Sequence, residues 1–288
     1  MTEPISPELL RRFYAAGWER RWLAWLNDHG VPGDTGYRLR LERTLALMRV
    51  PPTRPFRVLD AGCGVGIYAV QAARRFPGSR VLWIDLSPAH VAAATELAVR
   101  WNVSGRVTFQ VMDLTNPNLA SSLEGGWDVI LLAETLEHLL QPAPVLSHLQ
   151  CLAAPGGQIL VSVPQQTPDE RGESWVYHRV LTGRPNLESV EARDPATLPA
   201  GEVYTYYHRH YRPAEMEALF TQVGLAIRGR HTVFWQRPAH LTAWPWKVLD
   251  DLIGRTAWSW LDRTAQALGG SAWAQTLLWE CQVLGGQR

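Results

Sequence analysis

The chain has 288 residues and a formal net charge of +1, and 46 % of its residues are hydrophobic while 19 % are charged. This composition is typical of a globular protein and excludes an intrinsically disordered chain. The near-neutral charge gives no reason to expect a nucleic-acid partner, because affinity for a phosphate backbone depends on a basic surface. The first residues show neither a signal peptide nor a membrane-spanning stretch, so we expect a cytoplasmic protein.

The first fifty residues carry two helical patterns, over residues 7–27 and 37–48, which predict an N-terminal helical lid over residues 1–50. Beyond them, short apolar runs of strand length alternate with helical segments. The predicted strands are 56–60, 80–85, 107–112, 128–133 and 158–163, and the predicted helices between them are 67–76, 88–102 and 136–153. Such an alternation is typical of βαβ units with a parallel sheet.

The alternation stops after Pro164, and residues 165–205 indicate a long insertion over the sheet. Later predicted elements are a helix over 213–223, strands over 225–233 and 277–284, and a helical second insertion over 236–272. We therefore predict an α/β fold: a Rossmann-like, seven-stranded, mostly parallel sheet with helices on both faces, N-terminal helices and helical cap insertions. Residues 51–288 would form one domain, whose two insertions form a substrate cap.

The clearest motif follows the first predicted strand, where Asp60 precedes three alternating glycines, Gly62, Gly64 and Gly66. Glycines let the chain turn sharply and let the backbone approach a ligand at the carboxyl edge of an open sheet. A dinucleotide site favours Gly-x-Gly-x-x-Gly, but Ile67 stands where the last of those glycines would be. The acid before the glycines also suits a cationic ligand better than a pyrophosphate. A turn without a ligand is the remaining alternative.

Two further acids follow the next two strands. Asp85 ends the second strand, where a carboxylate can accept hydrogen bonds from both hydroxyls of a ribose; alone, it could equally be a helix cap. Asp113 follows the third strand, where its side chain could accept an adenine amino hydrogen while Met112 and Leu114 flank the ring. Each acid by itself is a weak signal, and both gain weight in combination with the glycine motif.

Taken together, these residues resemble the class I methyltransferase family. The resemblance covers residues 56–163, includes the Ala-Pro-Gly-Gly turn at 154–157, and extends to the segment 211–224. It implies an S-adenosylmethionine cofactor bound in an extended pose. The cofactor-binding residues that it implies, from the methionine part to the ribose and the adenine, are Asp60, Gly62, Gly64, Gly66, Glu134, Asp85, Leu86, Met112, Asp113 and Leu114. Arg38 or Arg40 could then reach the methionine carboxylate.

A second cluster, Glu134-Thr-Leu-Glu137-His138, follows the fourth predicted strand. The end of that strand faces the methyl group in the family, so His138, with Glu134, is the candidate base for an attacking hydroxyl. The Glu-x-x-Glu-His spacing also resembles ubiquinone-pathway O-methyltransferases and small-RNA 2′-O-methyltransferases, which implies a Mg²⁺ site on Glu134, Glu137 and His138. Alternatively, one acid only caps a helix. His208 and His210 could approach the same place, and His210 is a further catalytic candidate.

The resemblance implies methyl transfer to a small hydrophobic molecule, with oxygen as the expected acceptor atom. Alternatives are carbon or nitrogen methylation of a similar or lipid-like substrate, an RNA 2′-O-methyltransferase, and a cofactor-binding partner protein without catalysis. Tryptophans of the second insertion, such as Trp244 and Trp258, could line a pocket for that substrate, contact a membrane surface peripherally, or form the core beneath a cap.

Overall fold

The computed structural model describes residues 7, 8, 11, 14, 35–51, 54–62, 64–166, 176–182, 203–233 and 276–284. The tryptophan-rich second insertion at 236–272 lies outside these residues, and so do its expected roles in substrate or membrane contact. Most of the first insertion, at 165–205, also lies outside them.

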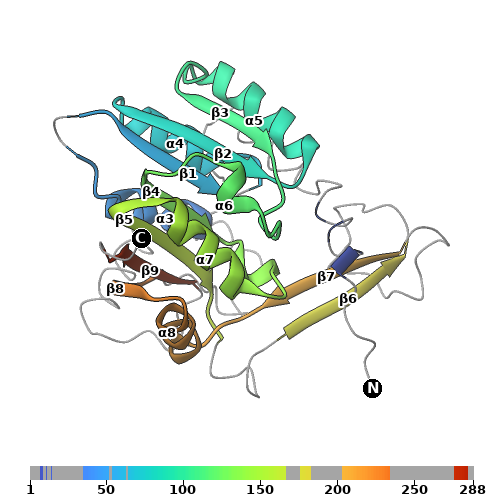
Figure 1. The fold of residues 1–288 in the computed structure, drawn as a ribbon. Coiled ribbons are helices and arrows are strands. Elements are labelled where there is room, and N and C mark those ends of the chain that lie inside the picture. Colours follow the sequence, from blue (N-terminus) through green and yellow to red (C-terminus); the bar gives the residue numbers. More distant parts are fainter. Residues whose placement is uncertain are drawn as a thin grey trace, which may run out of the picture.

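A seven-stranded sheet forms the centre of the molecule (Figure 1). Its strands are β1 (Phe56–Ala61), β2 (Ser79–Asp85), β3 (Val107–Val111), β4 (Trp127–Ala133), β5 (Ala153–Pro164), β8 (Leu225–Val233) and β9 (Thr276–Val283). They are ordered β3-β2-β1-β4-β5-β9-β8. The strands β1 to β5 pair in parallel, whereas β9 is antiparallel to both of its neighbours. The predicted mostly parallel sheet of seven strands is confirmed.

Helices cover both faces of this sheet. They are α3 (Thr35–Leu47), α4 (Ile67–Arg75), α5 (Pro88–Arg100), α6 (Leu119–Ser122), α7 (Pro142–Leu152) and α8 (Pro213–Gln222). The start of α5 is encoded locally, because the Ser87 side chain accepts a hydrogen bond from the His90 amide and Pro88 occupies the first turn. This cap fixes the direction in which α5 leaves β2.

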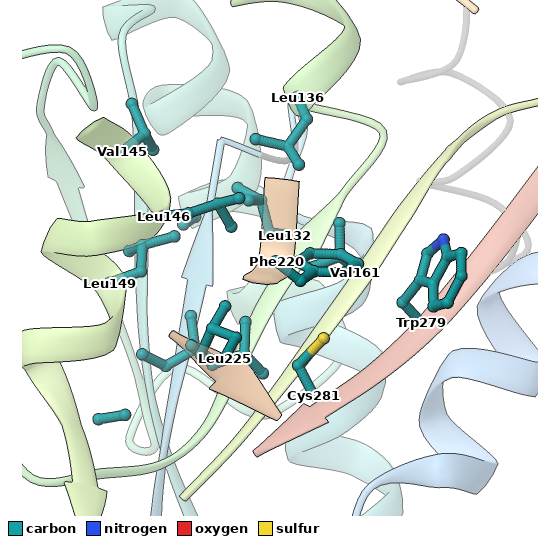
Figure 2. Packing of buried hydrophobic residues seen from close by; sticks show 14 of the residues in the cluster. Leu132, Leu136, Val145, Leu146, Leu149, Val161, Phe220, Leu225, Trp279 and Cys281 are labelled. Carbon is teal, nitrogen blue, oxygen red and sulfur yellow. The ribbon is translucent and has the colours of Figure 1, made fainter. Parts of the chain in front are cut away.

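Two hydrophobic clusters lie on opposite faces of the sheet, because successive residues of a strand point to opposite sides. Val58 of β1 belongs to the cluster that packs against α3, α4 and α5, and Leu59 belongs to the one beneath α6, α7 and α8. Figure 2 shows part of the second cluster, where Leu146 of α7 and Phe220 of α8 lie near Val161 of β5. Burial of each such side chain contributes about 1.5–3 kcal/mol of transfer free energy.

Helix α3, from the expected N-terminal lid, is part of the first of these clusters. Its residues Leu41 and Leu45, with Met48 just beyond it, are buried against β1 and α4. Gln158 of β5 holds the end of the helix, since its side chain donates to the Leu47 carbonyl at 2.9 Å and accepts from the Arg49 amide at 2.9 Å. Residues 35–49 therefore share the core of the sheet domain.

The predicted helix over 136–153 is divided in the structure. A single 3-10 turn spans Leu136–His138, and α7 begins only at Pro142. Proline lacks an amide hydrogen and disfavours helix in the residue before it, so it starts a helix more readily than it continues one. The break leaves Glu137 and His138 on a short turn at the edge of the sheet.

A second sheet, of two strands, begins within the insertion predicted at 165–205. This differs from the prediction, which expected the cap insertions to be helical. The second sheet pairs β6 (Val176–Thr182) with β7 (Val203–Arg209) in antiparallel register and extends away from the main sheet in Figure 1. Both strands are rich in valine, threonine and tyrosine, residue types that favour strands. Within the described ranges, no helix has both the length and the apolar character needed to cross a membrane.

Candidate functional site

A cavity of about 490 Å³ lies at the carboxyl ends of β1, β2, β3 and β4. This is the edge at which open α/β sheets bind their ligands. Ten of the residues expected from the sequence line it: Gly62, Gly64, Asp85, Leu86, Met112, Asp113, Leu114, Glu134, Glu137 and His138. The structure thus brings together residues that follow four different strands.

Three expected site residues do not line this cavity. Asp60 is completely buried within β1, and Gly66 stands at the start of α4 with a φ of 77°. A Cβ atom on Gly66 would lie 2.7 Å from the Cβ of Ala94, so this glycine allows α4 and α5 to pack closely. His210 lies behind His208, with 5.2 Å between the two ring centroids. The proposed ligand roles of Asp60, Gly66 and His210 stay predictions.

Gly62 joins the turn after β1 to the turn after β4. Its φ is 77°, and a Cβ there would lie 2.6 Å from Thr135 Cγ2. Thr135 Oγ1 donates a hydrogen bond to the Gly62 carbonyl at 2.8 Å. Any larger residue at position 62 would meet both a strained backbone and a fixed neighbour. Thr135 was not expected from the sequence to be a site residue.

The Asp85 carboxylate forms hydrogen bonds both with the glycine turn after β1 and with the start of α5. Its Oδ2 accepts from the Gly64 amide at 3.1 Å, and its Oδ1 accepts from the Ser87 amide at 2.8 Å. His90 Nδ1 lies 3.1 Å from the same Oδ1. Both Asp85 and His90 line the cavity, but only the aspartate was expected from the sequence. The available signal for His90 was its place in the first turn of a capped helix, five residues after Asp85.

Asp113 closes another side of the cavity. Its Oδ1 accepts from the amide and the hydroxyl of Thr115, at 2.8 and 2.7 Å. Arg11 Nε donates to its Oδ2 at 2.8 Å. Pro7, Arg11 and Tyr14 all line the cavity, and their spacing of four and three residues places them on one side of a helix. Arg11 was missed in the sequence, although this spacing could have indicated it.

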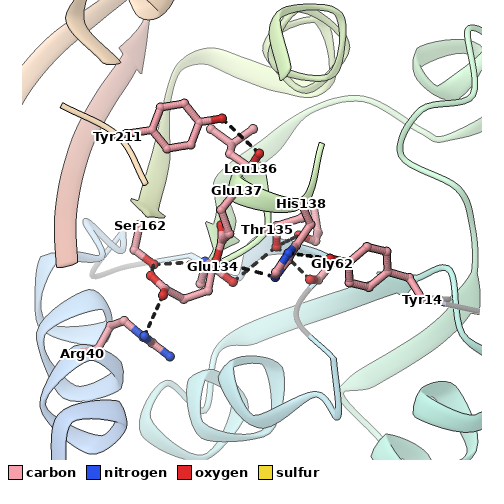
Figure 3. Close-up of polar contacts among 12 residues, drawn as sticks. Tyr14, Arg40, Gly62, Glu134, Thr135, Leu136, Glu137, His138, Ser162 and Tyr211 are labelled. Atoms are coloured by element: carbon pink, nitrogen blue, oxygen red, sulfur yellow. Dashed lines mark hydrogen bonds and ion pairs between the residues drawn. The ribbon is translucent and has the colours of Figure 1, made fainter. Parts of the chain in front are cut away.

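Glu134 is held between β5 and α3 (Figure 3). Ser162 Oγ donates to its Oε1 at 2.9 Å, and Arg40 Nη1 lies 2.7 Å from its Oε2. The backbone of Glu134 has a φ of 53°, a conformation uncommon for residues other than glycine and often found at functional sites. Burial alone would lower the pKa of Arg40, but the charge of Glu134, together with Tyr68 and Tyr37, raises it above its ordinary value.

Glu137 is an acid with almost no solvent exposure, at 1 %. Burial, followed by the nearby charge of Glu134, raises its pKa well above the ordinary value. Its Oε2 has no hydrogen-bond partner among the described residues, and its Oε1 lies 3.8 Å from His138 Nε2. These surroundings favour the neutral, protonated carboxyl group over the carboxylate.

His138 is placed between side chains from two other parts of the chain, Tyr14 near the N-terminus and His208 of β7. Its Nδ1 forms a 2.7 Å hydrogen bond with the hydroxyl of Tyr14 (Figure 3). The ring of His208, from β7, packs edge-on against it at a centroid distance of 5.1 Å. Burial, followed by the neighbouring His138 and His210, lowers the pKa of His208 to about 3. His208 is therefore a neutral neighbour of His138 at physiological pH.

The expected Mg²⁺ site on Glu134, Glu137 and His138 is not supported. The described residues contain no group of three His, Cys, Asp or Glu side chains that could hold a metal ion. Glu134 is occupied by Arg40 and Ser162, so a hard cation would have to displace both partners before this carboxylate could bind it. Within the part of the chain that the structure describes, the residues of the motif thus do not fit the metal centre that it implies.

An apolar wall completes the cavity beyond His138. It is formed at the turn before α7 and along that helix by Leu139, Leu140, Pro144 and Val145. Gln141 and His148 are the polar groups on this side. The cavity therefore has an acidic, hydrogen-bonding end beneath β2 and β3 and a largely apolar end beside His138.

Comparison of the sequence with known proteins identifies a family and relatives of this chain. A family model described as a methyltransferase domain matches residues 33–228. The ubiquinone biosynthesis O-methyltransferase of Acinetobacter baumannii is 31 % identical over 173 residues, which are 60 % of this chain and 64 % of that relative. This chain thus aligns with less than two thirds of the length of that protein.

Solved structures show the same architecture. A 1,6-didemethyltoxoflavin N1-methyltransferase from Burkholderia thailandensis, solved with its substrate and S-adenosylhomocysteine, superimposes with a TM-score of 0.55 at 16 % identity, over 99 % of this chain and 93 % of that one. An O-methyltransferase family protein from the same species gives a TM-score of 0.52 at 18 % identity, over 93 % of this chain and 61 % of that one. At these identities the likeness concerns the fold.

Proposed function

Because this chain belongs to the methyltransferase-domain family, we propose that it binds S-adenosylmethionine in the cavity and transfers the methyl group to a small hydrophobic acceptor, most readily at oxygen. The observation that carries the proposal is the line of polar groups along the cavity. Asp113, Asp85 and the Arg40–Glu134 pair follow one another from β3 to β4. This order matches the adenine, ribose and amino-acid parts of an extended cofactor.

The amino-acid part fits the ion pair between α3 and β4. An α-amino acid carries an ammonium and a carboxylate group, and Glu134 and Arg40 offer the opposite charges side by side, 2.7 Å apart. Each can exchange part of its contact with the other for a contact with the ligand, so no charge is left unpaired on binding. Glu134 then acts as a cofactor-binding residue, and Arg40 is the arginine that receives the carboxylate.

S-adenosylmethionine supplies a methyl group on a positively charged sulfur, which an acceptor atom can take in an in-line displacement. The chain's contribution is chiefly to hold the two partners in line and to exclude water, effects worth on the order of 7–11 kcal/mol in favourable intramolecular reactions. His138 accepts the proton that an attacking hydroxyl loses. Tyr14, hydrogen-bonded to Nδ1, orients the imidazole so that Nε2 serves as the base.

The nature of the acceptor follows from the other end of the cavity. Leu139, Leu140, Pro144 and Val145 bury apolar surface, and His208 with a pKa of about 3 adds no charge there. An uncharged, largely apolar molecule with a hydroxyl group suits these walls best. The O-methyltransferase named among the relatives supports oxygen as the acceptor atom, whereas the N-methyltransferase of the same fold makes nitrogen the second candidate.

Binding and turnover measurements together test this proposal. Calorimetric titration with S-adenosylhomocysteine should give saturable binding, and Asp85→Ala should weaken it by about tenfold or more, because ribose hydroxyls lose a charged partner. Incubation with methyl-labelled S-adenosylmethionine and a panel of phenols, aliphatic alcohols and amines should label an uncharged hydroxyl compound. Absence of saturable binding would overturn the proposal, and labelling of amines alone would replace oxygen by nitrogen.

A further inference from the structure

His90, a buried histidine on α5, stands directly behind the carboxylate proposed to bind the ribose. It is 6 % exposed, lies five residues after Asp85, and lines the cavity from the side of α5. Neither the family resemblance nor the comparisons assign it a role. The inference below rests on the proposed function, because it concerns how the nucleoside of S-adenosylmethionine would be recognised.

The hydrogen bonds of Asp85 are unequally divided between its two oxygens. Oδ1 receives the Ser87 amide at 2.8 Å and faces His90 Nδ1 at 3.1 Å, whereas among the described residues Oδ2 receives only the Gly64 amide, at 3.1 Å. A carboxylate offers about four acceptor positions, two on each oxygen. The protein therefore fills both positions of Oδ1 and one position of Oδ2.

His90 differs from the other two partners because it donates from a side chain. An ionised carboxylate can only accept, so the contact at 3.1 Å is favourable when Nδ1 carries the proton. The amides of Ser87 and Gly64 belong to the turn and the glycine loop and are present whatever the side chains are. His90 is thus the group that decides whether the second position of Oδ1 is taken by the protein or is left for a ligand.

We propose that His90 is a positioning residue that commits Oδ1 of Asp85 to the protein and leaves Oδ2 to accept a single ribose hydroxyl. Asp85 would then recognise one hydroxyl of the ribose diol and not both, which sharpens the expectation drawn from the sequence. The imidazole also prevents rotation of the carboxylate about its terminal bond, so that the one remaining acceptor position keeps its direction toward the cavity.

The test compares S-adenosylhomocysteine with its 2′-deoxy and 3′-deoxy analogues by calorimetric titration of the full chain. For the unchanged protein we expect one analogue to bind about tenfold or more weakly and the other to lose less than about threefold, since only one hydroxyl meets a charged acceptor. For His90→Ala we expect weaker binding of S-adenosylhomocysteine and a ratio between the two analogues that falls below about threefold, because the carboxylate can turn and accept either hydroxyl.

Two further variants separate positioning from general damage. His90→Asn should restore the ratio, because the asparagine amide can donate from nearly the same place as Nδ1. Glu96→Ala, an exposed change on the same helix, should leave all three affinities within about twofold of the unchanged protein. Thermal unfolding of each variant checks that α5 remains folded under the conditions of the titration.

Several results would overturn the inference. Equal losses with both deoxy analogues in the unchanged protein would mean that Asp85 recognises the whole diol. A His90→Ala variant that binds all three ligands more weakly by one common factor would show a purely structural histidine. If the unchanged protein did not bind S-adenosylhomocysteine at all, the proposed function would fail together with this inference, whereas the two preceding results would leave the proposed function intact.

Discussion

Arg40 of α3 and Glu134, the residue after β4, form an ion pair with 2.7 Å between Nη1 and Oε2. The pair connects the helix that precedes the first strand with the strand at the centre of the sheet. Both side chains are largely buried and both line the cavity. The pair therefore places a cation and an anion side by side where the amino-acid part of the cofactor is proposed to lie.

Replacing Arg40 by methionine should weaken binding of S-adenosylhomocysteine about tenfold to a hundredfold, because a carboxylate loses a charge-assisted partner. The loss should be much smaller for 5′-methylthioadenosine, which has the same nucleoside without the amino-acid part. Titration calorimetry with both ligands measures the difference. Glu42→Ala, an exposed change on the same helix, is the control, and equal losses for the two ligands would contradict the assignment.

His138→Ala should retain cofactor affinity and lose turnover by roughly 100- to 10,000-fold, because it removes the proton acceptor. Tyr14→Phe should lower kcat by roughly two- to tenfold through loss of one neutral hydrogen bond to Nδ1. If Tyr14 acts only through His138, the Tyr14→Phe change should have no further effect in a His138→Ala background. Steady-state kinetics of the three variants provide this double-mutant cycle, and independent effects would assign Tyr14 another role.

Gly62→Ala should destabilise the fold by about 1–3 kcal/mol, because alanine would carry a strained positive φ and a Cβ in conflict with Thr135. Gly78→Ala is a matched control, since a Cβ there meets nothing within 4 Å, and its unfolding free energy should change by less than about 1 kcal/mol. Urea denaturation measures both values. Equal stability of the two variants would show that the turn after β1 can relax.

Glu137 makes stability depend on pH in a direction opposite to that of most carboxyl groups. Burial, and then Glu134, raises its pKa in the folded state above the ordinary value of 4.5. Above pH 4.5 the unfolded chain therefore loses this proton while the folded chain keeps it, and stability falls as the pH rises toward the raised pKa. Below pH 4.5 both states are protonated and the contribution is constant.

Glu137→Gln removes that dependence, so its stability relative to the unchanged protein should increase between pH 4.5 and neutral pH, by on the order of 1 kcal/mol per pH unit while the folded group stays protonated. Denaturant titrations from pH 4 to pH 8 measure it. Glu96→Gln, at an exposed position, should shift the curve by less than about 0.5 kcal/mol at any pH. Parallel curves for Glu137→Gln and the unchanged protein would contradict the raised pKa.

Methyl transfer should survive exhaustive treatment with EDTA, with less than about twofold loss of kcat. Glu134 already contacts Arg40 and Ser162, so the Glu-x-x-Glu-His motif does not offer a free pair of carboxylates to a hard cation. Assays before and after dialysis, with Mg²⁺ restored as the control, measure the effect. A large loss that Mg²⁺ reverses would reinstate the metal site.

The order of the strands between residues 56 and 164 and the helices α4, α5 and α7 could be predicted from the sequence, since apolar runs alternate there with helical periods, whereas the short helix α6 was not predicted. One helix boundary was wrong because the local effect of a proline was overlooked. The segment 136–153 has apolar residues throughout, and Pro142 nevertheless divides it. The strands β6 and β7 were not predicted, because Pro, Gly, Asp and Glu over residues 165–205 indicated a loop, and the pairing of 176–182 with 203–209 depends on contacts across the residues between them.

The sequence by itself determined the sheet, the glycine turn and the acids that end its strands, because strand periodicity and turn chemistry depend on neighbouring residues. Only the tertiary structure decided what those acids contact. Tyr14 reaches His138 across 124 positions, Arg40 neutralises Glu134, and burial changes the preferred charge state of Glu137. Hydrogen bonding and desolvation depend on distance and solvent exclusion in three dimensions, so the Glu-x-x-Glu-His string by itself did not indicate that Glu134 pairs with Arg40 or that Glu137 is buried.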